Sequence, residues 1–114
     1  MEIRIIKDTI SKEELKKIAE NQFGDLVKAV VDIEEEIMAI GGELHADEEA
    51  LLLQHGSKQG NLWGINLRVD KAESEFVEFD SMINIRPSQN NKFRGVESLD
   101  IQRKIRDTVN KLIL

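Results

Sequence analysis

The sequence contains no cysteine, and Pro87 is its only proline. Without cysteine the chain cannot form a disulfide, a thiol nucleophile or a Cys-ligated zinc site, and it suits a reducing compartment. No apolar run approaches the roughly 20 residues that a membrane-spanning helix requires. The first residues, Met1-Glu2-Ile3-Arg4, lack the apolar stretch of a signal peptide. We therefore expect a soluble cytoplasmic protein that does not enter a membrane.

Acidic residues outnumber basic ones, with 22 Asp and Glu against 16 Lys and Arg and a net charge of −6. A nucleic-acid-binding module needs a basic face that replaces the counterions of the phosphates, so we expect no nucleic-acid partner. Charged residues make up 33% and hydrophobic residues 40% of the chain, a balance typical of a folded domain. At 114 residues, a single domain over 1–114 can bury a core without disulfides or a structural metal.

Two segments at opposite ends of the chain have the pattern of amphipathic helices. The first covers about 12–23, and it begins with the capping box that Ser11 forms with Glu14. The second begins at about Leu99, where Ser98 can cap it. Its apolar residues recur at helical spacing, at Ile101, Ile105, Val109 and Leu112. Each helix therefore has a stripe that must pack on another element.

Alternation of apolar and polar residues predicts the strands. These are a short strand within 2–7, a half-buried strand over 27–34, and further strands over 37–40, 63–69 and 77–85. The last two are separated by a short polar segment, which predicts an antiparallel hairpin. We expect an α+β domain of two layers, with a mostly antiparallel sheet of four to five strands and two or three helices. The N-terminal and C-terminal helices are expected on one face of this sheet.

The segment 43–55 is open to two interpretations. It has no β-branched residue and is followed by Gly56, which favours a helix. As a strand, it would place His45, Asp47 and Glu49 on one face, a group suited to acid–base catalysis or to a divalent metal. As a helix, it would bring His45 near Glu49 and leave Asp47 to cap the N-terminus. No motif in the sequence requires a metal or another cofactor.

A second polar cluster surrounds Pro87. Arg86 offers a planar fork of donors for carboxylate or phosphate, and Asn84 and Asn90 add neutral donors nearby. With Asp32, these residues are candidates for binding a small anion. The alternative is a turn rich in Asn for conformational reasons, in which Arg86 pairs with a structural acid. In either case we expect a partly buried Arg86, paired with an acid from a neighbouring strand.

Polar residues also share the outward faces of the predicted strands, and if both helices cover one face they would occupy an open sheet surface. They are Asp32, Glu34, Asn66, Arg68, Asp80, Asn84 and Arg86. One hypothesis is a small domain that binds, or acts on, a polar or anionic small molecule. The alternative is a non-enzymatic interaction module or a homodimer that uses the free sheet face or edge. A concave polar pocket would favour the first hypothesis, and an apolar patch the second.

Several strings in the chain resemble an uncharacterised family of short, single-domain prokaryotic proteins. They are Val31-Asp32-Ile33-Glu34, Gly41-Gly42-Glu43-Leu44-His45-Ala46-Asp47, Gly56-Ser57-Lys58-Gln59 and Ile83-Asn84-Ile85-Arg86-Pro87. His55 stands where the family pattern has an acid. The resemblance covers nearly the whole chain and implies no particular activity. It raises the two polar clusters above the rest of the surface as candidate sites.

Overall fold

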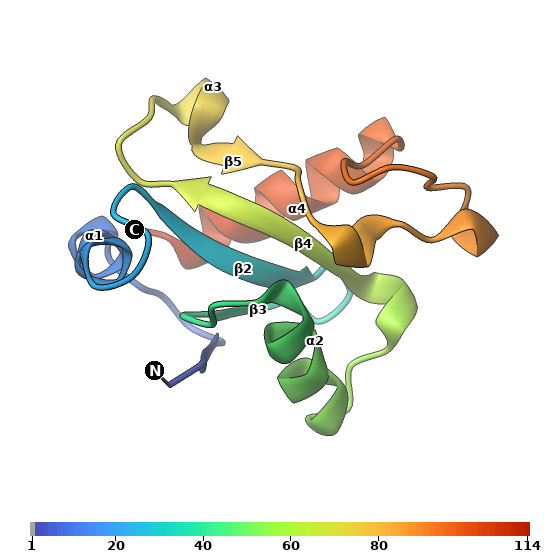
Figure 1. Ribbon diagram of the computed structural model, residues 1–114, viewed down its shortest axis with the longest axis horizontal. Coiled ribbons are helices and arrows are strands. Elements are labelled where there is room, and N and C mark those ends of the chain that lie inside the picture. Colours follow the sequence, from blue (N-terminus) through green and yellow to red (C-terminus); the bar gives the residue numbers. More distant parts are fainter. Residues whose placement is uncertain (1) are drawn as a thin grey trace.

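A five-stranded antiparallel sheet, in the order β1-β3-β2-β4-β5, forms the centre of the computed structural model, which describes residues 2–114 (Figure 1). The strands are β1 (Arg4–Ile6), β2 (Leu26–Asp32), β3 (Ile37–Ile40), β4 (Leu62–Arg68) and β5 (Val77–Glu78). The α-helices are α1 (Lys12–Glu20), α2 (His45–Gln54), α3 (Glu73–Phe76) and α4 (Leu99–Leu112). The predicted α+β fold with an antiparallel sheet is confirmed. No helix within residues 2–114 is long and apolar enough to cross a membrane.

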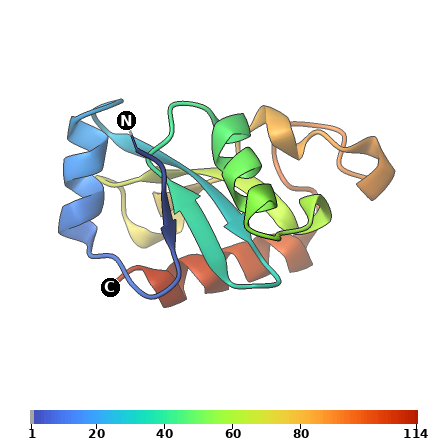
Figure 2. The ribbon, with the colours of Figure 1, turned by 90° about the horizontal axis from the view of Figure 1, so that it is seen from below.

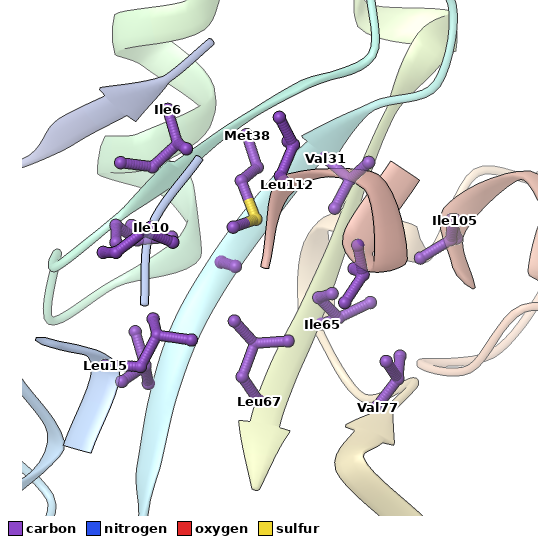
Figure 3. Close-up of a cluster of buried hydrophobic side chains, with 14 of the residues drawn as sticks. Ile6, Ile10, Leu15, Val31, Met38, Ile65, Leu67, Val77, Ile105 and Leu112 are labelled. Atoms are coloured by element: carbon purple, nitrogen blue, oxygen red, sulfur yellow. The ribbon is translucent and has the colours of Figure 1, made fainter. Parts of the chain in front are cut away.

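The helices α1 and α4 pack on the same face of the sheet, as predicted. Ser11 Oγ accepts a hydrogen bond from the backbone N–H of Glu14 at the start of α1. Ser98 Oγ does the same for Ile101 at the start of α4, so both predicted caps are confirmed. The apolar stripes of the two helices complete one buried cluster with the sheet (Figure 3). Its members from these helices are Leu15, Ala19, Ile105, Val109 and Leu112.

The other face of the sheet is partly covered by α2, which adds a third layer that the sequence did not predict. In Figure 2 α4 lies below the sheet and α2 above it. A second buried cluster joins this helix to the sheet, formed by Val30, Ala39, Leu52 and Leu62. The helix interpretation of 43–55 is therefore correct, and Gly56, at φ +99°, follows the helix as its expected stop. As a result, β2 is buried on both faces rather than half-buried.

The chain leaves the sheet earlier than the alternation over 77–85 predicts. β5 has only two residues, which pair antiparallel with β4. Residues 82–84 form a 3-10 turn instead of continuing the strand. Ser81 packs directly on Gly64 of β4, where an added Cβ would lie 2.5 Å from Ser81 Oγ. The predicted hairpin is thus correct in direction and wrong in length, because the segment crosses over β4 after residue 78.

Candidate functional site

The candidate site is a pocket of about 220 Å³ at the N-terminal end of α2, on the face of the sheet that this helix covers. It opens between α2, the strands β2 and β4, and the segment 80–83. We call it the His45 pocket. Its lining residues are Lys28, Leu44, His45, Ala46, Asn66, Asp80, Ser81, Met82, Ile83 and Arg94. Of the residues in the two predicted clusters only His45 lines it, but Asn66 and Asp80, predicted on the shared polar surface of the sheet, line it as well.

His45 is the first residue of α2, and one ring nitrogen is anchored on the sheet. Its Nε2 lies 2.8 Å from the carbonyl oxygen of Ile65 on β4. Since a carbonyl can only accept, Nε2 carries the hydrogen. Burial lowers the pKa of His45, so the ring is neutral at pH 7 and its lone pair is on Nδ1. Nδ1 makes no hydrogen bond within the described chain, which leaves it free to accept a hydrogen bond or a proton.

Asn66, on β4, lines the same pocket, and one of its amide atoms has no hydrogen-bond partner within residues 2–114. The residue is only 7% exposed, and its Nδ2 donates to Glu78 Oε1 at 2.8 Å. This bond fixes the orientation of the amide, because a carboxylate accepts and does not donate. The other amide atom, Oδ1, is buried and has no hydrogen-bond partner within residues 2–114. Six buried side-chain atoms within residues 2–114 lack a partner, and Asn66 Oδ1 is the one that belongs to a residue of this lining.

The charge of the His45 pocket comes from Lys28, which stands directly opposite Asn66 in the pairing of β2 with β4. Lys28 takes part in none of the ion pairs of residues 2–114, and its Nζ lies 5.1 Å from the ring centre of Phe23. The other two charged lining residues, Asp80 and Arg94, pair with each other at 2.6 Å. With a neutral imidazole, the pocket therefore carries the net positive charge of Lys28.

The opening of the pocket is flanked by apolar side chains. Leu44 and Met82 both line it, and they are 57% and 64% exposed. Ile83, which is partly buried, lies between the pocket and the cluster under α2. Clefts that combine an apolar wall with a few converging polar groups are typical of small-molecule sites. The pocket therefore suits a ligand with a short carbon skeleton and polar substituents.

Comparison with known proteins places the chain in a family but gives it no function. Residues 4–112 match the family model described as Protein of unknown function (DUF5674). The chain belongs to this family. The match covers nearly the whole chain and confirms the resemblance to an uncharacterised family. Neither the curated proteins nor the solved structures gave a significant match.

The three residues predicted as an acid–base or metal group do not converge on α2. Asp47 is exposed, whereas His45 faces the sheet. Glu49 is half-buried and lies outside the His45 pocket. Asp47 does not cap the helix, because the N-cap position belongs to Leu44, which makes no side-chain cap. In the part of the chain that the structure describes, no three His, Asp or Glu side chains are placed to hold a metal ion.

Asn84, predicted as an anion ligand, lies fully buried against the free side of β4. Its Oδ1 accepts from the backbone N–H of Gly64 at 2.8 Å, and its Nδ2 donates to the Gly64 carbonyl at 2.9 Å. The same Nδ2 donates to the carbonyl of Arg94 at 3.0 Å. The amide thus supplies both bonds that a neighbouring strand would have made to Gly64. Its polar atoms are used inside the fold and do not reach the His45 pocket.

Asp32, at the end of β2, and Asn90, directly after the 3-10 turn at 87–89, also lie away from the His45 pocket. Asp32 is fully buried, and its Oδ1 accepts from the N–H groups of Glu34 and Glu35, both at 3.0 Å. Its Oδ2 accepts from Ser57 Oγ at 2.6 Å, which ties the β2–β3 turn to the loop after α2. Asn90 is exposed and has φ +60°, a left-handed conformation that Asn tolerates well. Both residues therefore have conformational roles in the fold.

Arg86 is partly buried, as expected, but the predicted pairing with an acid is wrong. Its Nη1 donates to the Gln59 carbonyl at 2.6 Å, and its Nη2 donates to the Leu62 carbonyl. The guanidinium carbon lies 4.2 Å from the ring centre of Trp63. None of the ion pairs within residues 2–114 includes Arg86. Because β5 ends at Glu78, Arg86 does not lie beside the acidic residues of the neighbouring strands. It lies instead at the turn formed by residues 59–61.

We expect Arg86→Ala to lower the free energy of unfolding by about 2 kcal/mol, because charged hydrogen bonds to carbonyls and a stacked cation are lost. Arg86→Lys should recover little, since an ammonium cannot bridge two carbonyls while it lies flat on an indole. Urea denaturation followed by circular dichroism measures the loss. Arg103→Ala, an exposed arginine of α4, is the control. Equal effects at the two positions would contradict this role of Arg86.

Two important residues were not candidates on the sequence. Lys28 looked like an ordinary outward residue of β2, and its meeting with Asn66 depends on the register between two strands. Glu48 is fully buried one turn after His45 on α2, and its Oε2 accepts from the Gly42 N–H at 3.0 Å. Burial raises the pKa of Glu48 to about 9, so this acid is protonated at pH 7. Glu48 follows His45 by three residues, so in the helix interpretation of 43–55 the two side chains lie on the same face. This spacing could have predicted that Glu48 is buried.

Proposed function

We propose that this protein binds a small molecule that carries an anionic group and a hydrogen-bond donor, in the His45 pocket. The observation that carries the proposal is the buried, unpartnered Oδ1 of Asn66 beside the unpaired cation of Lys28. A buried acceptor without a donor costs free energy that a bound donor would recover. A lysine without a carboxylate partner can pair with the anion of the same ligand.

The lining assigns a distinct role to each polar group of such a ligand. The anion would contact Lys28 Nζ, and a hydroxyl or amine would donate to Asn66 Oδ1. His45 Nδ1 offers a second acceptor, because Nε2 is held by the Ile65 carbonyl. This neutral imidazole can also act as a general base, because its Nδ1 can accept a proton from a bound hydroxyl. Hydroxy acids and amino acids combine the required groups.

The size of the pocket limits the ligand. Its volume of about 220 Å³ lies below the usual range of about 300–1,000 Å³ for sites that bind drug-sized ligands. The exposed side chains of Leu44 and Met82 can contact a short carbon skeleton at the opening. We therefore favour acids of two to four carbons over nucleotides or oligomers.

We expect glycerate to raise the melting temperature, with a rise that saturates as the concentration increases, as binding to the native state requires. Propionate lacks the hydroxyls and glycerol lacks the anion, so each should stabilise the protein less. Differential scanning fluorimetry with a panel of hydroxy acids, amino acids and their phosphate esters measures the effect. Lys28→Met should abolish the stabilisation, while Lys58→Met, in the loop after α2, should retain it. If no member of the panel stabilises the protein at roughly 10 mM, the proposal is wrong.

The alternative, an interaction module or homodimer through the sheet, has little free surface to use in this fold. On the face of the sheet that carries α2, the segment that includes Ser81 and Ile83 covers Gly64. The helix α2 covers another part of the same face. The outer edges belong to β1, with three residues, and β5, with two. Such short edges offer few backbone groups to a partner strand. We therefore assign the binding function to the pocket and not to a sheet surface.

A further inference from the structure

A second cavity, of about 280 Å³, lies beside α4, on the side of the sheet opposite α2. It is bounded by α4, the first residue of α1 and the segment 71–77. We call it the Arg106 cavity. It shares no lining residue with the His45 pocket, so the two sites can be tested separately.

The floor of the Arg106 cavity is apolar. Val77 and Val109 belong to the main buried cluster, and Phe76 and Ile113 pack against it from the side of the cavity. The cavity is large enough to admit water, so apolar surface on its floor is in contact with solvent. A ligand with an apolar body would remove this surface from water.

The rim of the cavity carries three cations, Lys12, Lys71 and Arg106. None of them takes part in an ion pair of residues 2–114. Glu73 is the one acidic side chain in the lining. The guanidinium carbon of Arg106 lies 4.9 Å from the ring centre of Phe79, which restrains its position. With Glu73 counted against the three cations, the side chains of the lining carry a net charge of +2, which favours an anion at the rim.

From these two features we infer that the Arg106 cavity binds a small apolar carboxylic acid. The carboxylate is held at the rim, where the planar guanidinium of Arg106 can donate two parallel hydrogen bonds. The hydrocarbon part lies on the floor formed by Val77, Val109 and their neighbours. A small polar anion such as phosphate would satisfy the cations but leave this floor uncovered, so the apolar acid is favoured.

The volume sets the size of the hydrocarbon part. An apolar cavity of about 150 Å³ is sufficient for benzene. The Arg106 cavity, at about 280 Å³, can therefore take an aromatic ring with a short side chain. An arylalkanoate of the size of 3-phenylpropionate fits this description and is the probe that we would use.

The test is a titration of the ¹⁵N-labelled full chain with 3-phenylpropionate, followed by amide chemical shifts. We expect saturable shifts at Val77 and Val109, with a dissociation constant below about 1 mM. The neutral isostere 3-phenylpropanamide should bind about tenfold more weakly, because the ion pairs are lost. Arg106→Gln should weaken the binding of 3-phenylpropionate by a similar factor.

The controls separate this inference from the proposed function. Lys104→Gln, an exposed change on the same helix, and Lys28→Met, in the His45 pocket, should both leave the affinity unchanged. Circular dichroism would show that Arg106→Gln remains folded. Equal affinity for the acid and the amide, shifts confined to Lys28 and Asn66, or no saturation up to roughly 10 mM would each overturn the inference.

Discussion

Asn84→Ala is expected to lower the free energy of unfolding by about 4 kcal/mol, the largest loss that we predict for a single side chain of this fold. The substitution leaves the N–H and the carbonyl of Gly64 without partners in a fully buried site. It also removes the bond to the Arg94 carbonyl, which holds the returning loop. Each buried polar group that loses its partner costs about 1–3 kcal/mol. Urea denaturation followed by the fluorescence of Trp63, which is buried, measures the loss.

The control is Asn90→Gly, in the same amide-rich loop. Asn90 is exposed and already has a positive φ, which glycine adopts without strain, so this change should alter stability by less than about 0.5 kcal/mol. Asn84→Asp separates the two halves of the amide, because it keeps the acceptor for the Gly64 N–H and loses the donor. We expect it to be as damaging as Asn84→Ala, since a carboxylate would then face two carbonyls. A loss below about 1 kcal/mol for Asn84→Ala would show that the backbone finds other partners.

The elements that the sequence predicts well are those fixed by local chemistry. Ser11 and Ser98 cap their helices from positions that can be identified within four residues of sequence. Gly56 ends α2 through its own backbone conformation. Most strands and the placement of α1 and α4 on one face also follow from periodicity. The predictions are wrong where the backbone hydrogen bonds of one segment depend on a segment distant in the sequence.

The alternation over 77–85 is the clearest of these errors. Alternating apolar and polar side chains are compatible both with a strand and with an irregular segment that crosses a neighbouring strand. Which of the two forms here depends on contacts with β4. Gly64 permits the close approach of Ser81, and Asn84 then supplies the hydrogen bonds of the missing strand. No pattern within the segment reports these partners. The displaced position of Arg86, and hence its wrong predicted pairing, follows from the same crossing.

The candidate site was only partly predictable for a related reason. His45 could be singled out because it stands close to Asp47 and Glu49 in the sequence. Its true neighbours, Lys28 and Asn66, meet through strand register, which periodicity alone does not give. Asp32 and Asn84 attracted attention as polar residues in unusual strings, yet their polar atoms bind backbone inside the fold. Side chains of this kind cannot be distinguished from ligand-binding ones until their partners are known.

Glu48, one turn after His45 on α2, makes the stability of the fold depend on pH. Its carboxyl is fully buried, with one oxygen held by the Gly42 N–H and the other without a partner in the described chain. Gly42 has no Cβ, and an added one would lie 2.9 Å from Glu48 Cγ, so the close approach depends on this glycine. Burial raises the pKa of Glu48 to about 9 from an ordinary value of 4.5. The native state therefore keeps a proton that the unfolded state releases at neutral pH.

Replacing Glu48 by glutamine should consequently stabilise the protein, and by more as the pH rises. The raised pKa means that the contribution of Glu48 to stability is complete below pH 4.5 and is lost as the pH increases toward 9. Glutamine keeps an oxygen for the Gly42 N–H and has no proton to lose. We expect the two proteins to be similar near pH 4.5 and the variant to be more stable by roughly 5 kcal/mol at pH 8. Urea denaturation of both proteins between these pH values measures the difference.

The difference between variant and wild type isolates Glu48, because every other titrating group is present in both proteins. Glu13→Gln, on the exposed side of α1, is the matched control and should change stability by less than about 0.5 kcal/mol at each pH. A gap for Glu48→Gln that stays constant with pH would show that the carboxyl ionises in the native state without cost. A gap that widens toward low pH would reverse the sign and contradict the buried, protonated form. A gap that widens toward high pH, in turn, would show that Glu48 keeps its proton in the native state, because burial disfavours the carboxylate more than the Gly42 N–H stabilises it.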